Sequence, residues 1–268
     1  MIGISTYAYL WRLSDRMPEP LTLDGFLDDA ARHGVGLVQI CDNATLDHMM
    51  PDGVQRLRAR ATALGLAIEI GTRGVATDHL LRYLELAVAL ECTLVRTMIA
   101  PHEGTIDLEW ATDQLRAAMP AFERAGVTLA IETYEQVPTS SLIATIEAVD
   151  SAALGICLDP GNSIAALELP SDVVRLAAPL VRNIHVKDFC FTRDDGTVGF
   201  RLTGAPLGQG ALDVASMAAA VRPAERGINL IIEQWLPWQH DPAATADLEA
   251  RWLDVSLAQL RALEPLMP

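Results

Sequence analysis

Eight short apolar runs, each followed by an amphipathic helix-like stretch, recur through the whole chain. The runs are continuous rather than alternating in polarity, which is typical of strands in a parallel sheet covered by helices. The predicted strand and helix pairs are Ile2–Thr6 with Leu23–Arg32, Gly36–Ile40 with Val54–Leu64, Leu66–Ile70 with Asp78–Leu90, Thr93–Ile99 with Leu108–Arg124, Val127–Glu132 with Ser141–Val149, Leu154–Asp159 with Asp172–Leu180, Arg182–Lys187 with Val214–Arg222, and Ile228–Glu233 with Ala244–Leu263. This order of elements predicts an α/β protein.

Glycines and chain length narrow the architecture further. Four glycines lie between a predicted helix and the next strand, where a helix commonly ends: Gly34, Gly65, Gly126 and Gly227. Eight units within 268 residues match a (β/α)8 barrel, the TIM barrel. An open, doubly wound sheet is the main alternative, but it usually has a glycine-rich loop after its first strand, where this chain has Tyr7–Trp11. We therefore expect a single TIM-barrel domain over residues 1–268.

Composition excludes several classes of function. The net charge of −15 predicts a surface that repels phosphates, so we expect no nucleic-acid partner. No apolar run approaches the roughly 20 residues that span a bilayer, so we expect no membrane association. The four cysteines are widely spaced, which indicates neither a disulfide framework nor a zinc ribbon. Because the first residues also lack the pattern of a signal peptide, we expect a cytoplasmic protein.

Four neighbouring predicted strands end in side chains that can bind a metal. These residues are Glu132, Asp159, His185 and Glu233. The carboxyl ends of barrel strands meet at one face, where the active site of a TIM barrel lies. Burying three carboxylates together is costly unless a cation balances them. Three oxygen donors and one imidazole predict one divalent metal ion, Mn²⁺ first, with Mg²⁺, Co²⁺, Fe²⁺ or Zn²⁺ as alternatives.

Lys187 is the only lysine in the chain, and it follows His185 by two residues at a strand end. A chain that otherwise uses only arginine as its cation has retained a lysine at the predicted active site. We expect Lys187 to bind a substrate carboxylate or phosphate, or to orient Glu132 or Asp159. Asp188 is interpreted as a structural partner of Lys187.

The chain resembles the xylose-isomerase-like TIM-barrel superfamily, in its branch of sugar and sugar-phosphate isomerases and epimerases. The motifs that carry the resemblance are Glu132, Asp159 with Pro160-Gly161-Asn162, His185-Val186-Lys187-Asp188, Arg201, Gly208-Gln209-Gly210 and Glu233. The resemblance implies that the Glu, Asp, His and Glu bind one divalent metal and that the two glutamates act as acid and base. It implies isomerisation or epimerisation of a small sugar through an enediolate. Arg201 resembles the family arginine that supports developing oxygen charge.

Two departures from the family pattern leave the reaction open. Asn162 stands where a substrate-binding histidine is common, and Gln209 replaces the glutamate of a Gly-Glu-Gly segment. The segments 199–210 and 233–238 also resemble a subgroup that includes decarboxylases of 3-oxo sugar acids. The alternative function is therefore a metal-dependent decarboxylase or lyase that uses the same site, because a chelated ketone accepts electrons whether a proton or CO₂ leaves.

Several further residues are candidates for the substrate pocket. His102 follows the fourth strand, and Tyr7, Tyr9 and Trp11 could form an apolar wall with Trp235 and Trp238. We interpret Glu69 as a helix cap rather than a fifth acidic group. The longest irregular segment, Phe189–Gly210, is interpreted as a functional loop. We expect a small carbohydrate or sugar acid as substrate and a homo-oligomer, dimer or tetramer, as the assembly.

Overall fold

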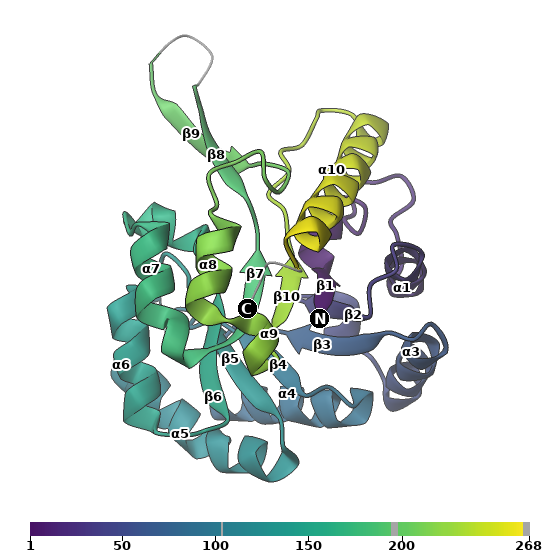
Figure 1. Cartoon of the computed structure of the whole chain (residues 1–268). Helices are drawn as coiled ribbons and strands as arrows, with labels where there is room; N and C mark the ends of the chain where they lie inside the picture. Colours follow the sequence, from purple (N-terminus) through teal and green to yellow (C-terminus); the bar gives the residue numbers. More distant parts are fainter. Residues whose placement is uncertain (103, 194–197, 265–268) are drawn as a thin grey trace.

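The computed structural model describes residues 1–102, 104–193 and 198–264, and its central feature is a closed barrel of parallel strands (Figure 1). The strands follow one another around the barrel in the order β1-β10-β7-β6-β5-β4-β3-β2. Their bounds are β1 Ile2–Ser5, β2 Leu37–Cys41, β3 Ala67–Gly71, β4 Leu94–Thr97, β5 Thr128–Glu132, β6 Leu154–Leu158, β7 Val181–Val186 and β10 Asn229–Ile232. The predicted (β/α)8 barrel is confirmed, and the open sheet is excluded.

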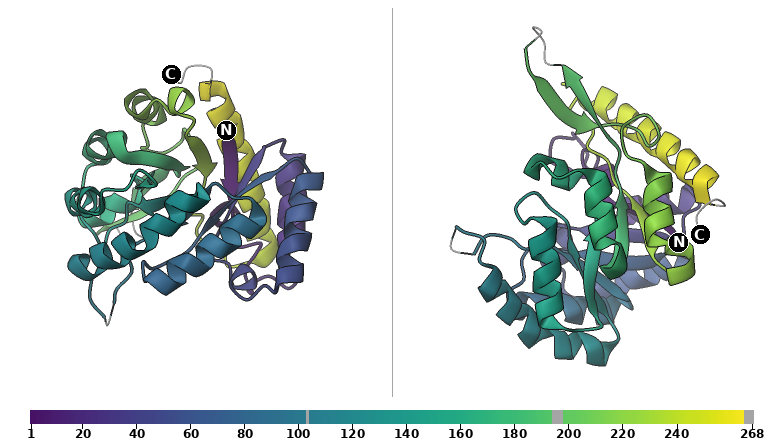
Figure 2. Two further views of the ribbon diagram at one scale, coloured as in Figure 1. Left: turned by 90° about the horizontal axis from the view of Figure 1, so that it is seen from below. Right: turned by 60° about the vertical axis from the view of Figure 1, so that its left-hand side comes forward.

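Helices surround the strands on the outside of the barrel, as the view from below shows (Figure 2). They are α1 Leu23–Arg32, α2 Ala44–Asp47, α3 Pro51–Ala63, α4 Thr77–Leu90, α5 Leu108–Ala125, α6 Thr139–Val149, α7 Pro170–Ala177, α8 Val214–Val221, α9 Pro223–Arg226 and α10 Pro242–Leu263, with short 3₁₀ segments η1 Thr6–Tyr9, η2 Asn162–Ala166 and η3 Ala178–Leu180. The four glycines predicted to end helices all have positive φ angles, a conformation that costs glycine little. Among the helices of the described residues, none is both long and apolar enough to cross a bilayer.

The apolar core lies mainly between the strands and the helices rather than inside the barrel. Because side chains alternate between the two faces of a strand, Val38 and Ile40 of β2 join the outer core while Gln39 between them faces the lumen. The same alternation in β7 places Ile184 in the outer core and both Asn183 and His185 inside. The lumen is therefore rich in polar groups, and those groups must satisfy one another's hydrogen bonds.

The segment Phe189–Gly210 is not an irregular loop throughout, so that prediction was wrong. It contains an antiparallel pair, β8 Phe189–Arg193 and β9 Phe200–Gly204, which projects beyond the barrel from the end of β7 (Figure 1). Phe191 of β8 pairs with Leu202 of β9, but both strands are exposed toward the tip, so most of this ribbon lies in solvent on both faces. Its base is tied to the barrel where Gly204 N donates to the carbonyl oxygen of Trp235.

Candidate active site

The fold brings the four predicted metal ligands together at the carboxyl ends of adjacent strands. Glu132 ends β5, Asp159 follows β6, His185 lies in β7 and Glu233 follows β10. The Nδ1 atom of His185 lies 3.6 Å from Glu132 Oε2, 3.8 Å from Asp159 Oδ2 and 3.4 Å from Glu233 Oε1. All four side chains are at most 4 % exposed. The predicted proximity of these side chains is therefore present, and three acidic groups converge on one ring nitrogen.

The hydrogen bonds of His185 show that this cluster fits a divalent cation. Its Nε2 donates to Gln39 Oε1 at 2.8 Å, whereas its buried Nδ1 has no hydrogen-bond partner among the described residues. The lone pair of a ring nitrogen is repelled by three nearby carboxylates unless a proton or a cation lies between them, so this arrangement is unfavourable without one. Burial lowers the pKa of His185, but Cys157, Glu233 and Glu132 outweigh it and raise this pKa well above 6.5. Both observations indicate that the cluster attracts positive charge, and its oxygen and nitrogen donors suit an ion such as Mn²⁺ or Mg²⁺.

Arg96 is a site residue that the sequence reasoning missed. It lies in β4, is 2 % exposed, and its Nε donates to Glu132 Oε2. Its Nη1 donates to Thr72 O at 3.1 Å and to Asp42 Oδ2 at 3.3 Å. Burial raises the pKa of Glu132, but Arg96, His185 and Lys187 together outweigh burial and hold this pKa well below its usual range. A single arginine inside the apolar run Leu94–Thr97 was the signal in the sequence.

Asn162 contacts the second oxygen of Glu132. Its Nδ2 donates to Glu132 Oε1 at 2.6 Å, so donors from Arg96 and Asn162 occupy both carboxylate oxygens. The backbone N–H groups of Gly161 and Asn162 donate in turn to Asp159 Oδ1, at 3.1 and 3.3 Å. This local turn, which aspartate commonly makes with the backbone that follows it, fixes the orientation of the Asp159 carboxylate.

Lys187 lies inside the acidic cluster. Its Nζ is 2.6 Å from Asp159 Oδ2 and 3.3 Å from Glu233 Oε2, and it stands 4.4 Å above the ring centre of Trp235. The side chain is only 4 % exposed. Burial lowers the pKa of Lys187, but Asp159 and Glu233 outweigh it and raise this pKa above 10.5. The contact with Asp159 is one of those expected from the sequence, and the contact with Glu233 adds a second.

Asp188 does not pair with Lys187, so that interpretation was wrong. Its carboxylate accepts backbone N–H groups of Phe189, Gly208, Gly210 and Leu212 at 2.8 to 3.0 Å. A Cβ atom at Gly210 would lie 2.2 Å from Asp188 Oδ1, so only glycine fits beside this carboxylate. Asp188 therefore holds the loop that follows β9 against the barrel.

Glu69 is not a helix cap, because its side chain points into the barrel rather than toward a helix end. Its carboxylate accepts from Gln39 Nε2 and Asn183 Nδ2 at 2.9 and 3.0 Å, and from Asn229 Nδ2 at 2.7 Å. The helix that follows β3 begins after Ala76, which makes no side-chain cap. Burial raises the pKa of Glu69, while hydrogen bonds from the three amides lower it, and the net direction is upward.

The remaining predicted substrate-binding residues lie farther from the cluster. Arg201 is exposed on β9, opposite Thr192, and His102 stacks at 4.0 Å on Trp110 of α5. Trp11 donates through Nε1 to the carbonyl oxygen of Leu236 at 2.6 Å, and its ring lies 5.2 Å from that of Trp238. Their contacts with substrate stay predictions.

Of the five aromatic residues predicted to form a wall, two are engaged elsewhere. Tyr9 is fully buried and packs edge-on against Phe26, so it belongs to the core. The hydroxyl of Tyr7 donates to Asp42 Oδ2 at 2.7 Å. The wall is therefore reduced to tryptophans: Trp11 with Trp238, and Trp235 beside Lys187.

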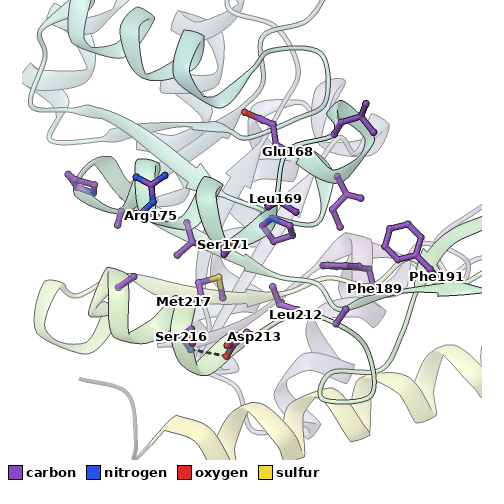
Figure 3. A pocket seen from close by; sticks show the side chains of 18 residues that line it. Glu168, Leu169, Ser171, Arg175, Phe189, Phe191, Leu212, Asp213, Ser216 and Met217 are labelled. Atoms are coloured by element: carbon purple, nitrogen blue, oxygen red, sulfur yellow. Dashed lines mark hydrogen bonds between the residues drawn. The ribbon is translucent and has the colours of Figure 1, made fainter.

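A hollow lies on the flank of the barrel, between α7, α8 and the base of β8 (Figure 3). Its volume is about 820 Å³, and its lining is mostly apolar, with Phe189, Phe191, Leu212 and Met217 facing the space. None of the four clustered acidic and histidine residues lines it. It offers apolar surface but no group of reactive side chains, so the mouth of the barrel is the candidate active site.

The chain belongs to the xylose isomerase-like TIM barrel family, whose model matches residues 27–255. It is 48 % identical, over 98 % of its length and 96 % of the relative's, to the 3-oxo-isoapionate decarboxylase of Pectobacterium atrosepticum. Among solved structures, a D-psicose 3-epimerase superposes with a TM-score of 0.72, at 12 % identity, covering 98 % of this chain and 97 % of that one. A barrel of this family from Mycobacterium smegmatis, in complex with magnesium, superposes with a TM-score of 0.69 at 17 % identity, covering 96 % of each chain. The resemblance stated from the sequence is confirmed, and the family is one of enzymes.

Proposed function

We propose that this protein is a metal-dependent decarboxylase of a 3-oxo sugar acid, with 3-oxo-isoapionate or a close analogue as its substrate. The high identity with a 3-oxo-isoapionate decarboxylase favours this alternative over the isomerase or epimerase that headed the sequence prediction. In the structure, the proposal depends most on Lys187, a buried ammonium placed between Asp159 and Glu233 at the barrel mouth.

The residues that would hold the metal are Glu132, Asp159, His185 and Glu233, because their donor atoms converge around the unpartnered His185 Nδ1. When bound, a divalent cation supplies a Lewis acid that draws electron density from the 3-oxo group of the substrate. Decarboxylation breaks the bond between the carboxylate and its neighbouring carbon. The electron pair of that bond moves toward the oxo oxygen, CO₂ leaves, and the carbon then takes up a proton.

Decarboxylation needs a cation near the substrate carboxylate and a proton for the carbon that loses CO₂. Lys187 supplies the cation, and Lys187 together with Glu233 supplies the proton. Lys187 Nζ and Glu233 Oε2 are 3.3 Å apart, so the pair can share a proton and deliver it to the carbon that has lost CO₂. The hydroxyl of Ser5 donates to Glu233 Oε1 at 2.9 Å and holds the carboxylate in place. The Lys187 ammonium also orients the substrate carboxylate before the bond breaks.

The contacts of Glu132 also favour decarboxylation. Arg96 and Asn162 donate to its two oxygens, and a carboxylate that accepts such donors is a weak base. An epimerase or isomerase needs a group that removes a proton from carbon. Loss of CO₂ needs no base, so a restrained Glu132 is compatible with decarboxylation but is a handicap for proton abstraction.

Epimerisation of a small ketose is the second candidate function. Glu132 ends β5 and Glu233 follows β10, two strands that β6 and β7 separate, so the two glutamates lie on either side of Asp159 and His185, as an acid and base that flank one substrate would. The structural likeness to a D-psicose 3-epimerase supports the same fold for both chemistries.

Incubation of two samples in D₂O distinguishes decarboxylation from epimerisation. The protein is loaded with Mn²⁺ and given 3-oxo-isoapionate in one sample and a panel of ketoses in another. We expect release of CO₂ from the acid, with one deuterium on the carbon that carried it, and no change in the ketoses. Deuterium exchange into ketoses without CO₂ release from the acid would contradict the decarboxylase and support the epimerase.

A further inference from the structure

A chain of buried polar side chains runs through the barrel lumen from Glu69 to His185, and the proposed reaction uses none of its inner members. Glu69 Oε2 accepts from Gln39 Nε2 at 2.9 Å, and Gln39 Oε1 accepts from His185 Nε2 at 2.8 Å. Asn183 contacts both Glu69 and Gln39. Its Nδ2 donates to Glu69 Oε2 at 3.0 Å, and its Oδ1 accepts from Gln39 Nε2 at 3.1 Å. All four side chains are 2 % exposed or less.

The direction of every hydrogen bond in this chain follows from Glu69. A third amide, Nδ2 of Asn229, donates to its Oε1 at 2.7 Å, so the two oxygens receive three donors. All three side chains present NH₂ groups to the carboxylate, which therefore acts as an acceptor in each of these hydrogen bonds. Gln39 must therefore turn its NH₂ group toward Glu69, which leaves its oxygen facing His185.

The orientation of Gln39 in turn dictates which nitrogen of His185 carries hydrogen. An amide oxygen only accepts, so the ring must hold its proton at Nε2. The lone pair of a neutral ring then lies at Nδ1, the atom that faces Glu132, Asp159 and Glu233. The opposite tautomer would set two acceptors against each other at 2.8 Å.

We infer that Glu69 and Gln39 are positioning residues that fix the tautomer and the ring orientation of His185 so that Nδ1 is presented to a metal ion. Partners of this kind behind a ligating histidine typically change metal affinity 10- to 100-fold when removed. The inference rests on the proposed metal site but not on the decarboxylation reaction.

The first test removes the acceptor behind His185. We expect Gln39→Leu to weaken the binding of Mn²⁺ alone, measured by calorimetric titration of the full chain, by about 10- to 100-fold. Gln114→Leu is the matched control: Gln114 Oε1 accepts from Thr77 N and Oγ1 at 2.9 and 2.7 Å in the outer helix layer, away from the lumen. Its Mn²⁺ affinity should equal that of the unaltered protein. Equal affinity in the Gln39→Leu protein would overturn the inference.

An exchange of the two side chains distinguishes positioning from a general need for packing. Gln39→Glu alone sets two carboxylates against each other, so we expect weakened Mn²⁺ binding. Adding Glu69→Gln to that variant gives position 69 an NH₂ group, which donates to the new carboxylate at position 39. That carboxylate also accepts from His185 Nε2, and Asn183 turns its amide over to fit the exchanged pair. We expect the double variant to bind Mn²⁺ as tightly as the unaltered protein or more tightly. A double variant that is folded but binds no better than Gln39→Leu would contradict the inference.

A spectroscopic measurement separates this inference from the metal site itself. The protein is labelled with ¹⁵N-histidine, and the His185 resonances are assigned by their loss in His185→Asn. At a pH above the raised pKa of His185, where the ring is neutral, we expect the metal-free protein to carry hydrogen at Nε2, and the Gln39→Leu protein to show loss of that N–H signal or a mixture of tautomers. If the unaltered protein bound no Mn²⁺ through His185, the metal proposal would fail, while this tautomer measurement would still decide the inference. An unchanged Nε2–H signal in Gln39→Leu would overturn it.

Discussion

Buried carboxylates lie at two places in the barrel, within the lumen and at the mouth, and their partners differ. Glu69, within the lumen, accepts hydrogen bonds from three uncharged amides. Glu132, Asp159 and Glu233, at the mouth, contact Arg96 and Lys187 and also face the unpartnered Nδ1 of a histidine. Burial is nearly equal in the two groups, at 4 % exposed or less. Burial alone therefore does not distinguish a structural carboxylate from a reactive one.

The two places differ in the hydrogen-bonding groups and the charges that the partners of the carboxylates leave unsatisfied. Amide donors meet every acceptor of Glu69 without net charge, so this residue has no capacity left for a ligand. At the mouth, Arg96 and Lys187 balance the negative charge of the three carboxylates only in part, and the lone pair of His185 Nδ1 remains available to a metal ion. The comparison predicts different consequences for the same glutamate-to-glutamine change. At the mouth it removes a group that carries a proton, whereas in the lumen it changes the hydrogen bonds that orient Gln39 and His185.

The largest effect is expected for Glu233→Gln. The amide cannot carry the proton that decarboxylation requires, so we expect kcat for CO₂ release to fall about 10²- to 10⁴-fold, the usual contribution of general acid catalysis. The folded structure should persist, as circular dichroism can verify. Glu91→Gln serves as the control, because Glu91 is exposed and pairs with Arg58 on the surface, and it should keep kcat within a few-fold of the original. Full activity in Glu233→Gln would show that the acid has been assigned to the wrong residue.

The next effect concerns the balance of charge around Glu132. Arg96→Met leaves the buried Glu132 and the part-buried Asp42 without their shared cation. We expect the free energy of unfolding of the metal-free protein to fall by about 3–5 kcal/mol, the usual cost of breaking a buried pair.

The measurement for Arg96→Met is urea denaturation, and Arg116→Met is its control. Arg116 pairs with Asp113 on the surface, where both side chains are more than half exposed, so its loss should matter little. Equal losses in the two variants would mean that Arg96 is not required to balance the mouth of the barrel.

A smaller stabilisation should follow from metal binding. At a free Mn²⁺ concentration of 100 times its dissociation constant, the folded state gains about 2.7 kcal/mol, which thermal unfolding with and without EDTA can measure. His185→Asn should lose most of this gain, whereas Gln114→Leu, in the outer helix layer, should retain it. An equal gain in the His185→Asn protein would locate the metal elsewhere.

The smallest effect is expected for the stability of Glu69→Gln. Replacing the carboxylate removes the cost of burying a charge, but it turns one N–H group toward a donor, and these two changes oppose each other. We expect the free energy of unfolding to change by less than about 1 kcal/mol, because the two effects are of similar size. A loss of several kcal/mol by urea denaturation would show that the acceptor at position 69 is indispensable.

The sequence predicted the four-residue cluster because each member stands at or next to a strand end, and the ends of adjacent parallel strands meet. It did not predict Arg96, because the predicted strand ran on to Ile99 and so placed this residue inside the strand rather than near its end, as in β4. It did not predict the role of Glu69, which lies in the middle of β3. Whether such a side chain faces the lumen or the helices depends on how the strands align when the barrel closes. Asp188 was misjudged for a related reason, since three of its four backbone partners, Gly208, Gly210 and Leu212, lie 20 to 24 residues further along the chain.

The hairpin β8–β9 was hidden by composition. The segment that contains it is rich in glycine and charged residues, which ordinarily indicates a loop. Its strands are stabilised by pairing with each other rather than by a buried face, and that pairing leaves only a weak periodic signal.

The solitary lysine has a practical consequence. A protease that cuts only after lysine has one site in this chain, at Lys187, directly after β7 and buried in the native barrel. Cleavage into two fragments therefore reports on opening of the barrel mouth, with no competing cuts in surface loops. Reagents that acylate amines should likewise modify no lysine side chain until this residue is released from Asp159.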